Sequence, residues 1–468
     1  MVSKMDWHQL MSRKRFRGRD EEPSEDKFSE VRSPFMKDTD RIIYSSPFRR
    51  LQDKTQVHPF PGTDYIRTRL THSLEVSTVG RALGLAAARY IIPNYKLDKG
   101  DDRFDSSDFG NVLAAACLAH DIGNPPFGHA GEEAIRHWYS DKGQKHLTKD
   151  VEKDEEKLAD FLAFEGNAQG FRILTRLAGW REKGGLRLSC ATIGTFMKYP
   201  RGSCAIDPET RSKSARSKFG YFQEDKYAFT LIADTLGLPA KEEDLGDRVR
   251  HPLSYLVEAA DDICYLIVDL EDGHKYKKLS YSQVFEFLED IIKNSPTKDD
   301  LKRLESIEDN ADKIAYLRAK SIGALVGEVD KVFRENIGDL LNGEFSGSLM
   351  SHIVSVDTIA KIRELSEKIL YSDHRKIEAE LAGYEVIHGL LKIYTDSFSE
   401  WEHVGYDLNK ISSRHQKVIQ LFPDFQLMPP DRYEWLLRVN DYISGMADRF
   451  ILAQFQKLKG IRIDIGRD

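Results

Sequence analysis

Apolar residues recur at helical spacing along most of the chain, and this pattern restricts the fold more than any other feature. From Val76 to Tyr90, apolar and small residues fall at relative positions 0, 3, 4, 7, 11 and 14, which is the spacing of one buried helix face. Segments in which polar and apolar residues alternate, as in a half-buried strand, are few and short. The sequence therefore predicts an all-α protein. Other stretches with helical spacing are 111–121, 253–267, 284–293, 314–333, 356–370, 377–398 and 433–458.

The composition excludes several classes of protein. Hydrophobic residues make up 40% and charged residues 31% of the chain, which is typical of a globular protein with a sizeable core. No apolar run reaches the roughly 18–20 residues of a membrane helix, and the first 20 residues lack the apolar stretch of a secretory signal. The four cysteines are scattered, which argues against a disulfide framework or a cysteine-based zinc site. We therefore expect a cytoplasmic protein without a membrane span.

The most informative stretch is the apolar helix that ends at His120 and Asp121. These residues precede Pro125 and Pro126, which cannot continue a helix. Adjacent helical side chains point about 100° apart, so one metal ion contacts both only if it lies between them. Further ligands must then come from other helices.

Two residues elsewhere in the chain are candidates for these further ligands. His72 lies four residues before Val76, on the buried face of its helix. Asp261 lies among apolar residues, where an unpaired carboxylate is costly to bury. A shared divalent cation explains both, so the proposed ligands are His72, His120, Asp121 and Asp261. Two imidazoles and two carboxylates without a thiolate favour Mn²⁺, Mg²⁺ or Fe²⁺ over structural Zn²⁺.

Each of these residues, taken alone, has a simpler interpretation. A single histidine on an apolar face is usually a hydrogen-bonded core residue, and a His-Asp dipeptide occurs by chance in many proteins. The pair Asp261-Asp262 could equally face solvent or form ion pairs. The metal-site hypothesis depends on these positions lying on apolar faces of separate helices.

The order of these residues resembles that of the HD-domain metal-dependent phosphohydrolases. Four further stretches resemble one branch of that superfamily, the deoxyguanosinetriphosphate triphosphohydrolases: HDIGNPPFGHAGE at 120–132, EGNAQ at 165–169, KYP at 198–200 and DYISGM at 441–446. These landmarks, with others, extend from about residue 41 to residue 450. The resemblance implies an HD-domain helical core, elaborated by additional N- and C-terminal helices and long loops.

The resemblance also implies an activity and the residues that perform it. The expected reaction is hydrolysis of dGTP, or of a wider set of deoxynucleoside triphosphates (dNTPs), to the deoxynucleoside and inorganic triphosphate by attack of water at the α-phosphorus. His129 and Glu132 correspond to the family's catalytic pair. The implied substrate-binding residues are Arg69, Asn167, Lys198 and Tyr199 for the triphosphate, and Gln56, Tyr265 and Asp269 for the sugar.

The domain organisation follows from the same resemblance. Three domains would be expected from length alone, at about 150 residues each, but the sequence has no internal repeat and no Gly/Ser- or Pro-rich linker. We expect a polar and basic N-terminal segment at 1–40, most simply a solvated tail. An HD-type catalytic core at 41–275 should follow, with insertions near 141–160 and 200–225. Residues 276–468 should form a helical part packed on this core.

Partners and alternatives complete the expectations. The resemblance implies Mn²⁺ or Mg²⁺ as cofactor, a homo-oligomer (typically a hexamer) and a single-stranded DNA effector. Because the formal net charge is −7, the positive charge that attracts a triphosphate must be local. Two alternatives are an HD-type phosphohydrolase with another nucleotide substrate, and a nucleic-acid-binding or regulatory scaffold. The EGNAQ and KYP stretches argue against the former and the intact ligand set against the latter.

Overall fold

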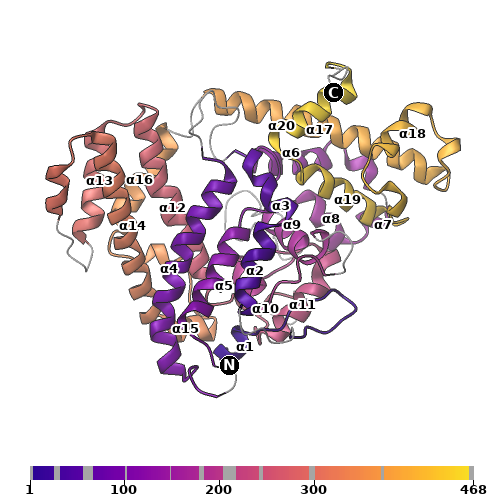
Figure 1. Ribbon diagram of the computed structural model, residues 1–468. Helices are drawn as coiled ribbons and strands as arrows, with labels where there is room; N and C mark the ends of the chain where they lie inside the picture. Colours follow the sequence, from indigo (N-terminus) through magenta and orange to yellow (C-terminus); the bar gives the residue numbers. More distant parts are fainter. Residues whose placement is uncertain are drawn as a thin grey trace.

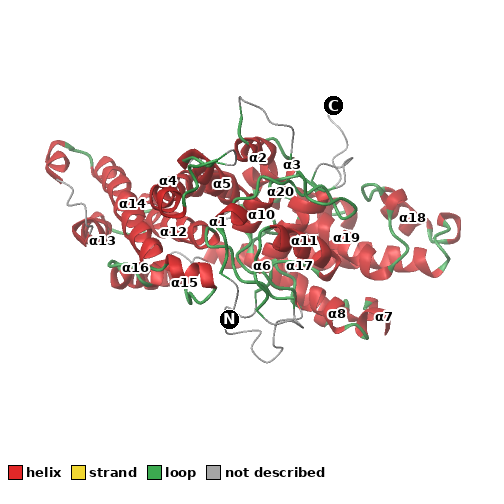
Figure 2. Ribbon diagram, turned by 90° about the horizontal axis from the view of Figure 1, so that it is seen from below, coloured by secondary structure: helices red, strands yellow, loops and turns green. Residues whose placement is uncertain are grey.

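The computed structural model describes residues 4–25, 32–55, 67–100, 103–147, 149–178, 184–203, 218–241, 246–294, 301–369 and 374–462. Within these ranges the protein is built from helices (Figures 1 and 2), and β-pairing is limited to isolated bridges. This confirms the all-α fold predicted from apolar spacing. No helix in this part of the chain is long and apolar enough to cross a bilayer.

Two antiparallel helices in the centre, α4 (Arg69–Tyr95) and α5 (Ser106–Ala119), bring distant residues of the sequence together (Figure 1). Each begins with a capping box, in which the N-cap side chain and the side chain three residues later satisfy each other's backbone N–H groups. They pack closely because Gly84 faces α5, where a Cβ atom would lie 2.7 Å from the carbonyl oxygen of Phe109. The start of α4 therefore lies beside the end of α5.

Two hydrophobic clusters form the core. The first surrounds α4, α5 and α12 (Ser254–Lys275) and extends to α13, α14 and α16. The second joins α6 (His129–Ser140) to α17 and α19. The described helices after residue 276 are thus divided between the two hydrophobic clusters, which lie on opposite sides of the molecule in Figure 1. The helices of these C-terminal groups are α13 (Tyr281–Asn294), α14 (Asn310–Glu335), α15 (Ile337–Asn342), α16 (Val356–Ile369), α17 (His374–His403), α18 (Ser413–Gln420), α19 (Arg432–Ser444) and α20 (Asp448–Lys459).

Shorter helices fill the space between these elements. The α-helices are α1 (Trp7–Leu10), α2 (Pro34–Ile43), α3 (Ser46–Arg50), α7 (Lys149–Glu152), α8 (Glu155–Leu162), α9 (Gly166–Arg172), α10 (Cys190–Phe196) and α11 (Lys226–Thr235). The 3₁₀-helices are η1 (Leu51–Asp53), η2 (Gln144–His146), η6 (Gln223–Asp225), η7 (Leu301–Ser306), η8 (Leu349–Ser351), η9 (Leu408–Lys410) and η10 (Phe425–Leu427). A π-helical turn, η3 (Ile173–Leu177), continues α9.

The N-terminal segment is not the solvated tail that its charge predicts. Trp7 is only 1% exposed, and Arg15 is fully buried in an ion pair with Asp38. The backbone N–H of Met5 donates to the carbonyl oxygen of Leu341, 2.9 Å away. The prediction was wrong because it considered only the net charge of the segment. The apolar side chains that lie between the basic residues are buried in the core.

Two further expectations need correction. The stretch 433–458 forms two helices rather than one, because α19 ends at Ser444 and α20 begins at Asp448. The apolar spacing continues across the break, but Lys54 and Arg50 donate to the carbonyl oxygens of Ser444 and Gly445 and so stabilise the interruption. The charged segment 141–160, whose composition favours a surface loop or an exposed helix, is not a single loop or helix. It forms short helices that are exposed or half-exposed at most described positions but bury Val151.

Candidate functional site

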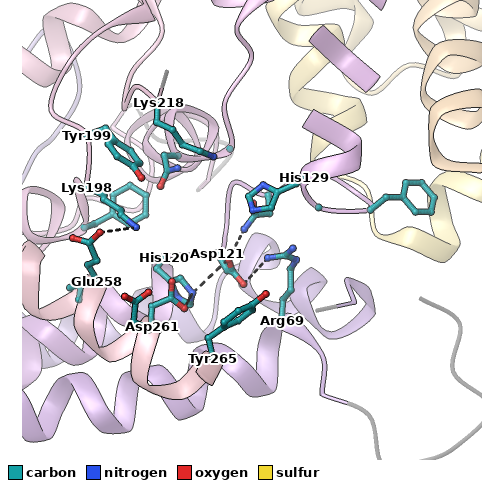
Figure 3. A pocket seen from close by; sticks show the side chains of 18 of the residues that line it. Arg69, His120, Asp121, His129, Lys198, Tyr199, Lys218, Glu258, Asp261 and Tyr265 are labelled. Carbon is teal, nitrogen blue, oxygen red and sulfur yellow. Dashed lines mark hydrogen bonds and ion pairs between the residues drawn. The ribbon is translucent and has the colours of Figure 1, made fainter. Parts of the chain in front are cut away.

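Three side chains from three helices converge at the meeting point of α4, α5 and α12. His72 lies in the first turn of α4, His120 caps the end of α5, and Asp261 lies in α12. Asp261 Oδ1 is 3.0 Å from His72 Nε2 and 3.5 Å from His120 Nε2. All three ligand atoms lie within 4.8 Å of one another. The structure therefore brings together three of the four proposed metal ligands; Figure 3 labels His120 and Asp261.

These distances suit a bound metal ion. Adjacent ligands held at right angles about 2.1 Å from an ion lie about 3.0 Å apart. His120 Nδ1 lies 2.7 Å from the carbonyl oxygen of Cys117 and donates to it, so Nε2 is the nitrogen that would bind a metal ion after losing its proton. The donor set of two imidazoles and a carboxylate thus fits a divalent cation.

Asp121 lies at the edge of this cluster. Its Oδ2 accepts a hydrogen bond from Arg69 Nη1 at 2.9 Å, and its Oδ1 accepts one from the side chain of Asn124. Oδ1 is also 3.6 Å from His120 Nε2. Asp121 is therefore close enough to join the ligands, but both of its oxygens already have hydrogen-bond donors.

The electrostatics of the cluster favour a cation. Burial lowers the pKa of His120, but the carboxylates of Asp121 and Asp261 outweigh burial and raise this pKa to about 9. Burial raises the pKa of Asp261, but His120 and His72 outweigh it and hold this pKa well below its usual range. Both carboxylates therefore remain negative, Asp121 in a buried position and Asp261 in a half-buried one, and positive charge beside them stabilises the cluster. A divalent ion would supply that charge, and its binding would release the proton of His120 Nε2.

His129 and Glu132 form a second group at the start of α6. His129 Nδ1 is 3.1 Å from Glu132 Oε2, and Glu132 Oε1 accepts a hydrogen bond from the backbone N–H of Gly166 at 2.8 Å. The His129 side chain is 82% exposed and borders the cavity, whereas that of Glu132 is 2% exposed. A buried carboxylate therefore orients an accessible imidazole. Gly166 belongs to the EGNAQ stretch, where a Cβ atom would lie 2.7 Å from Glu132 Oε1.

The surroundings of Glu132 predict an acid-dependent contribution to stability. Burial alone would raise its pKa, but the hydrogen bond from His129 and the charges of Lys218, His129 and Arg136 lower the pKa from 4.5 to about 2. The stabilisation is therefore complete above pH 4.5 and is lost as the pH falls towards 2. At pH 7 we expect Glu132→Gln to lower the free energy of unfolding by on the order of 3 kcal/mol.

Urea unfolding at a series of pH values measures this contribution. The gap between Glu132→Gln and the native protein should narrow as the pH falls from 5 to 3. Glu133→Gln, at an exposed neighbouring position, is the control and should follow the native pH dependence. A constant gap would contradict the proposed ionisation of Glu132.

A cavity of about 420 Å³ opens over both groups. This volume lies within the range of about 300–1,000 Å³ that is typical of small-molecule sites. Lys198 Nζ is 3.2 Å from Glu258 Oε1 on one side of the cavity, and Arg69 lies on the other (Figure 3). The other predicted substrate-binding residues in the lining are Asn167, Tyr199 and Tyr265.

Two predicted substrate-binding residues are not placed in the cavity. Asp269 is buried on α12, two turns beyond Asp261, and does not belong to the lining. Gln56 lies outside the described residues.

Sequence reasoning missed one cation of the cavity. Lys218 lines the cavity, and its Nζ is 3.1 Å from Glu165 Oε1 and 3.9 Å from Glu132 Oε2. Burial lowers its pKa, but Glu132 and Glu165 outweigh burial and raise it, so this lysine stays charged. A single lysine in a segment without periodicity carries no signal that could have identified it.

Comparisons with known proteins identify relatives of this chain. The HD domain family matches residues 69–172, which contain His72, His120, His129 and Glu132. A protein of Synechocystis named "deoxyguanosinetriphosphate triphosphohydrolase-like protein" is 41% identical, over 98% of this chain and 100% of its own. A Pseudomonas aeruginosa protein of the same name is 36% identical over 97% and 99%. The "deoxyguanosinetriphosphate triphosphohydrolase" of Cronobacter sakazakii is 30% identical over 98% of each chain.

Proposed function

Since this chain belongs to the deoxyguanosinetriphosphate triphosphohydrolase family of HD-domain hydrolases, we propose that it hydrolyses dGTP to deoxyguanosine and inorganic triphosphate. The observation that carries this proposal is a single cavity that unites three kinds of group. These are a cluster of metal-ligating side chains, a carboxylate-oriented histidine and several cations. A triphosphate ester needs all three, because its charge must be neutralised and its leaving oxygen must be protonated.

The metal centre would be formed by His72, His120 and Asp261, with Asp121 as the fourth ligand. The absence of a thiolate in this set favours Mn²⁺ or Mg²⁺, and Fe²⁺ fits the same donors. When bound, such an ion polarises a phosphoryl oxygen and so favours attack of water at phosphorus. Arg69 holds Asp121 in position through its Nη1.

His129 is the proposed general acid. Water attacks the α-phosphorus, the bond between this phosphorus and the sugar O5′ breaks, and O5′ takes a proton as it leaves. His129 presents an exposed imidazole to the cavity, and its Nδ1 lies against the carboxylate of Glu132. Because Glu132 accepts the hydrogen bond from Nδ1, Nε2 is left as the ring nitrogen that can deliver a proton to the leaving oxygen.

Arg69, Lys198 and Lys218 are the proposed triphosphate-binding cations, with Asn167 and Tyr199 beside them. Arg69 offers particular support, because its Nε is buried without a hydrogen-bond partner among the described residues. A phosphate oxygen would satisfy this donor. Lys198 and Lys218 each already contact a carboxylate, so a phosphate would share or replace that partner.

Tyr265 is the proposed sugar-contacting residue. It follows Asp261 by one helical turn and lines the same cavity. An aromatic ring at this position can exclude a 2′-hydroxyl, which would favour deoxynucleotides. Gln56 and Asp269 remain part of the proposed sugar site by family resemblance.

The proposed setting is the cytoplasm, where reducing conditions suit the free, buried thiols of Cys117, Cys190 and Cys264. By family resemblance we also propose a homo-oligomer, typically a hexamer, with single-stranded DNA as an effector. Sedimentation of the purified protein with and without an oligonucleotide tests both of these proposals.

A product assay tests the proposed reaction. The protein is incubated with dGTP and Mn²⁺ in H₂¹⁸O. The products are separated, and the mass of each product is determined by mass spectrometry. We expect equal amounts of deoxyguanosine and triphosphate, with ¹⁸O in the triphosphate because water attacks the α-phosphorus. Parallel reactions with the other dNTPs and with GTP measure the selectivity for base and sugar.

Other products would contradict the proposal in distinguishable ways. Pyrophosphate with dGMP would indicate cleavage of the anhydride between the α- and β-phosphates. Incorporation of ¹⁸O into deoxyguanosine would indicate attack of water at the sugar carbon C5′. No turnover of any dNTP, together with binding of single-stranded DNA, would favour the regulatory scaffold.

A further inference from the structure

The loop that connects α5 to α6 places His129, and its backbone is unusual. Phe127 has a φ of 63° and Gly128 a φ of 59°. A positive φ is unfavourable for a residue with a side chain such as Phe127, so the surroundings must hold it there. Because Pro125 and Pro126 lack N–H groups, Phe127 is also the first residue after them that can donate a backbone hydrogen bond.

The partner of this N–H is a buried carboxylate from the far end of the sequence. Asp448 Oδ1 accepts the hydrogen bond from Phe127 N at 3.1 Å, and its Oδ2 accepts bonds from the N–H and the hydroxyl of Thr55. Asp448 is 2% exposed. Both oxygens of Asp448 therefore accept hydrogen bonds from residues that border the cavity.

A buried lysine forms a hydrogen bond to the first residue of the same segment, Asn124. Lys54 Nζ donates to the carbonyl oxygen of Asn124 at 2.5 Å and to that of Ser444 at 2.9 Å. Burial lowers the pKa of Lys54 to about 7, and Asp448 is the strongest opposing influence. Lys54 and Asp448, called the loop anchor below, thus fix the two ends of the segment 124–127.

An aspartate in the first turn of a helix often interacts with the free backbone N–H groups at the start of that helix. In α20, however, the N-cap is Ala447, which provides no side-chain cap, and the carboxylate of Asp448 contacts Thr55 and Phe127. The carboxylate is therefore turned towards the loop.

We propose that Asp448 and Lys54 are positioning residues for His129: by holding Phe127 N–H and Asn124 C=O, they fix the start of α6 and aim the imidazole into the cavity. The catalytic consequence rests on the function proposed above, whereas the structural consequence does not. Loss of the anchor should misplace a group used in the chemical step, so kcat should fall while metal and substrate binding persist.

A double-mutant cycle tests the catalytic part. Asp448→Ala should lower kcat about 10- to 100-fold in the native background but less than about 2-fold in His129→Ala, since both changes remove the same contribution. KM and Mn²⁺ affinity should change less than about threefold. Arg449→Ala is the matched control; it removes a neighbouring exposed ion pair to Asp53 and should retain native kcat.

Hydrogen exchange of residues 120–132 tests the structural part without relying on turnover. Asp448→Ala and Lys54→Met should each speed amide exchange in this segment at least about fivefold relative to Arg449→Ala, at a temperature where all are folded. Unchanged exchange in both variants would overturn the proposal. An equal loss of kcat in both His129 backgrounds would also overturn it, because the effect would then be general. If the native protein fails to cleave dGTP, the proposed function falls, and exchange alone decides on the anchor.

Discussion

Asp261→Ala removes the bound metal and lowers turnover of dGTP at least about 10³-fold, on the proposed assignment. Asp261 Oδ1 is the atom that lies near both His72 Nε2 and His120 Nε2, so its removal leaves two imidazoles without the shared carboxylate. Metal content of the purified variant and calorimetric titration with Mn²⁺ measure the first effect. Product formation with saturating Mn²⁺ measures the second.

Asp262→Ala is the matched control for metal binding. Asp262 is the next residue of α12, but its carboxylate pairs with Arg363 at 2.9 Å rather than with the cluster. This variant should keep the metal affinity of the native protein. If Asp261→Ala itself binds Mn²⁺ as tightly as the native chain, the ligand assignment is wrong.

His129→Ala should lower kcat by about 10² to 10⁴, the range for loss of a general acid. The metal should remain, because His129 is not among the converging ligand atoms. Some stability should also be lost, because His129 gives Glu132 a hydrogen bond that lowers the pKa of this carboxyl; kinetics is therefore measured at a temperature where the variant is folded. Steady-state kinetics with Mn²⁺ titration separates these effects.

His137→Ala provides a control on the same helix. His137 lies two turns beyond His129 and stacks on His388 with ring centroids 5.5 Å apart. Its replacement should leave kcat near the native value. Loss of both metal and rate in His129→Ala would instead identify His129 as a ligand.

Helical spacing was sufficient to predict an all-α fold, and the hypothesis of a shared cation predicted that His72, His120 and Asp261 would lie together. His72 and Asp261 are polar residues on otherwise apolar helix faces. Such residues are unusual enough to be noticed in a single sequence. The family motifs supplied His129 and Glu132, whose roles remain to be tested. Each of these residues could be identified either from its neighbours in the sequence or from a family motif.

Other features of the site depend on contacts that leave no local pattern. Asp448 and Phe127 are 321 residues apart, and an aspartate at a helix start looks ordinary in sequence. Lys218 lies in a segment without periodicity. Even Arg69, which the resemblance assigned to phosphate, has an ion pair with Asp121 that spacing alone did not predict.

The docked N-terminal segment has a consequence for how the protein is made. Met5 hydrogen-bonds to Leu341 and Leu10 accepts from His251, and both of these partners are synthesised long after the N-terminal segment. Until those residues emerge, the apolar side chains of the segment lack their final partners and are available to chaperones. Completion of this part of the core must therefore wait until Leu341 has been translated.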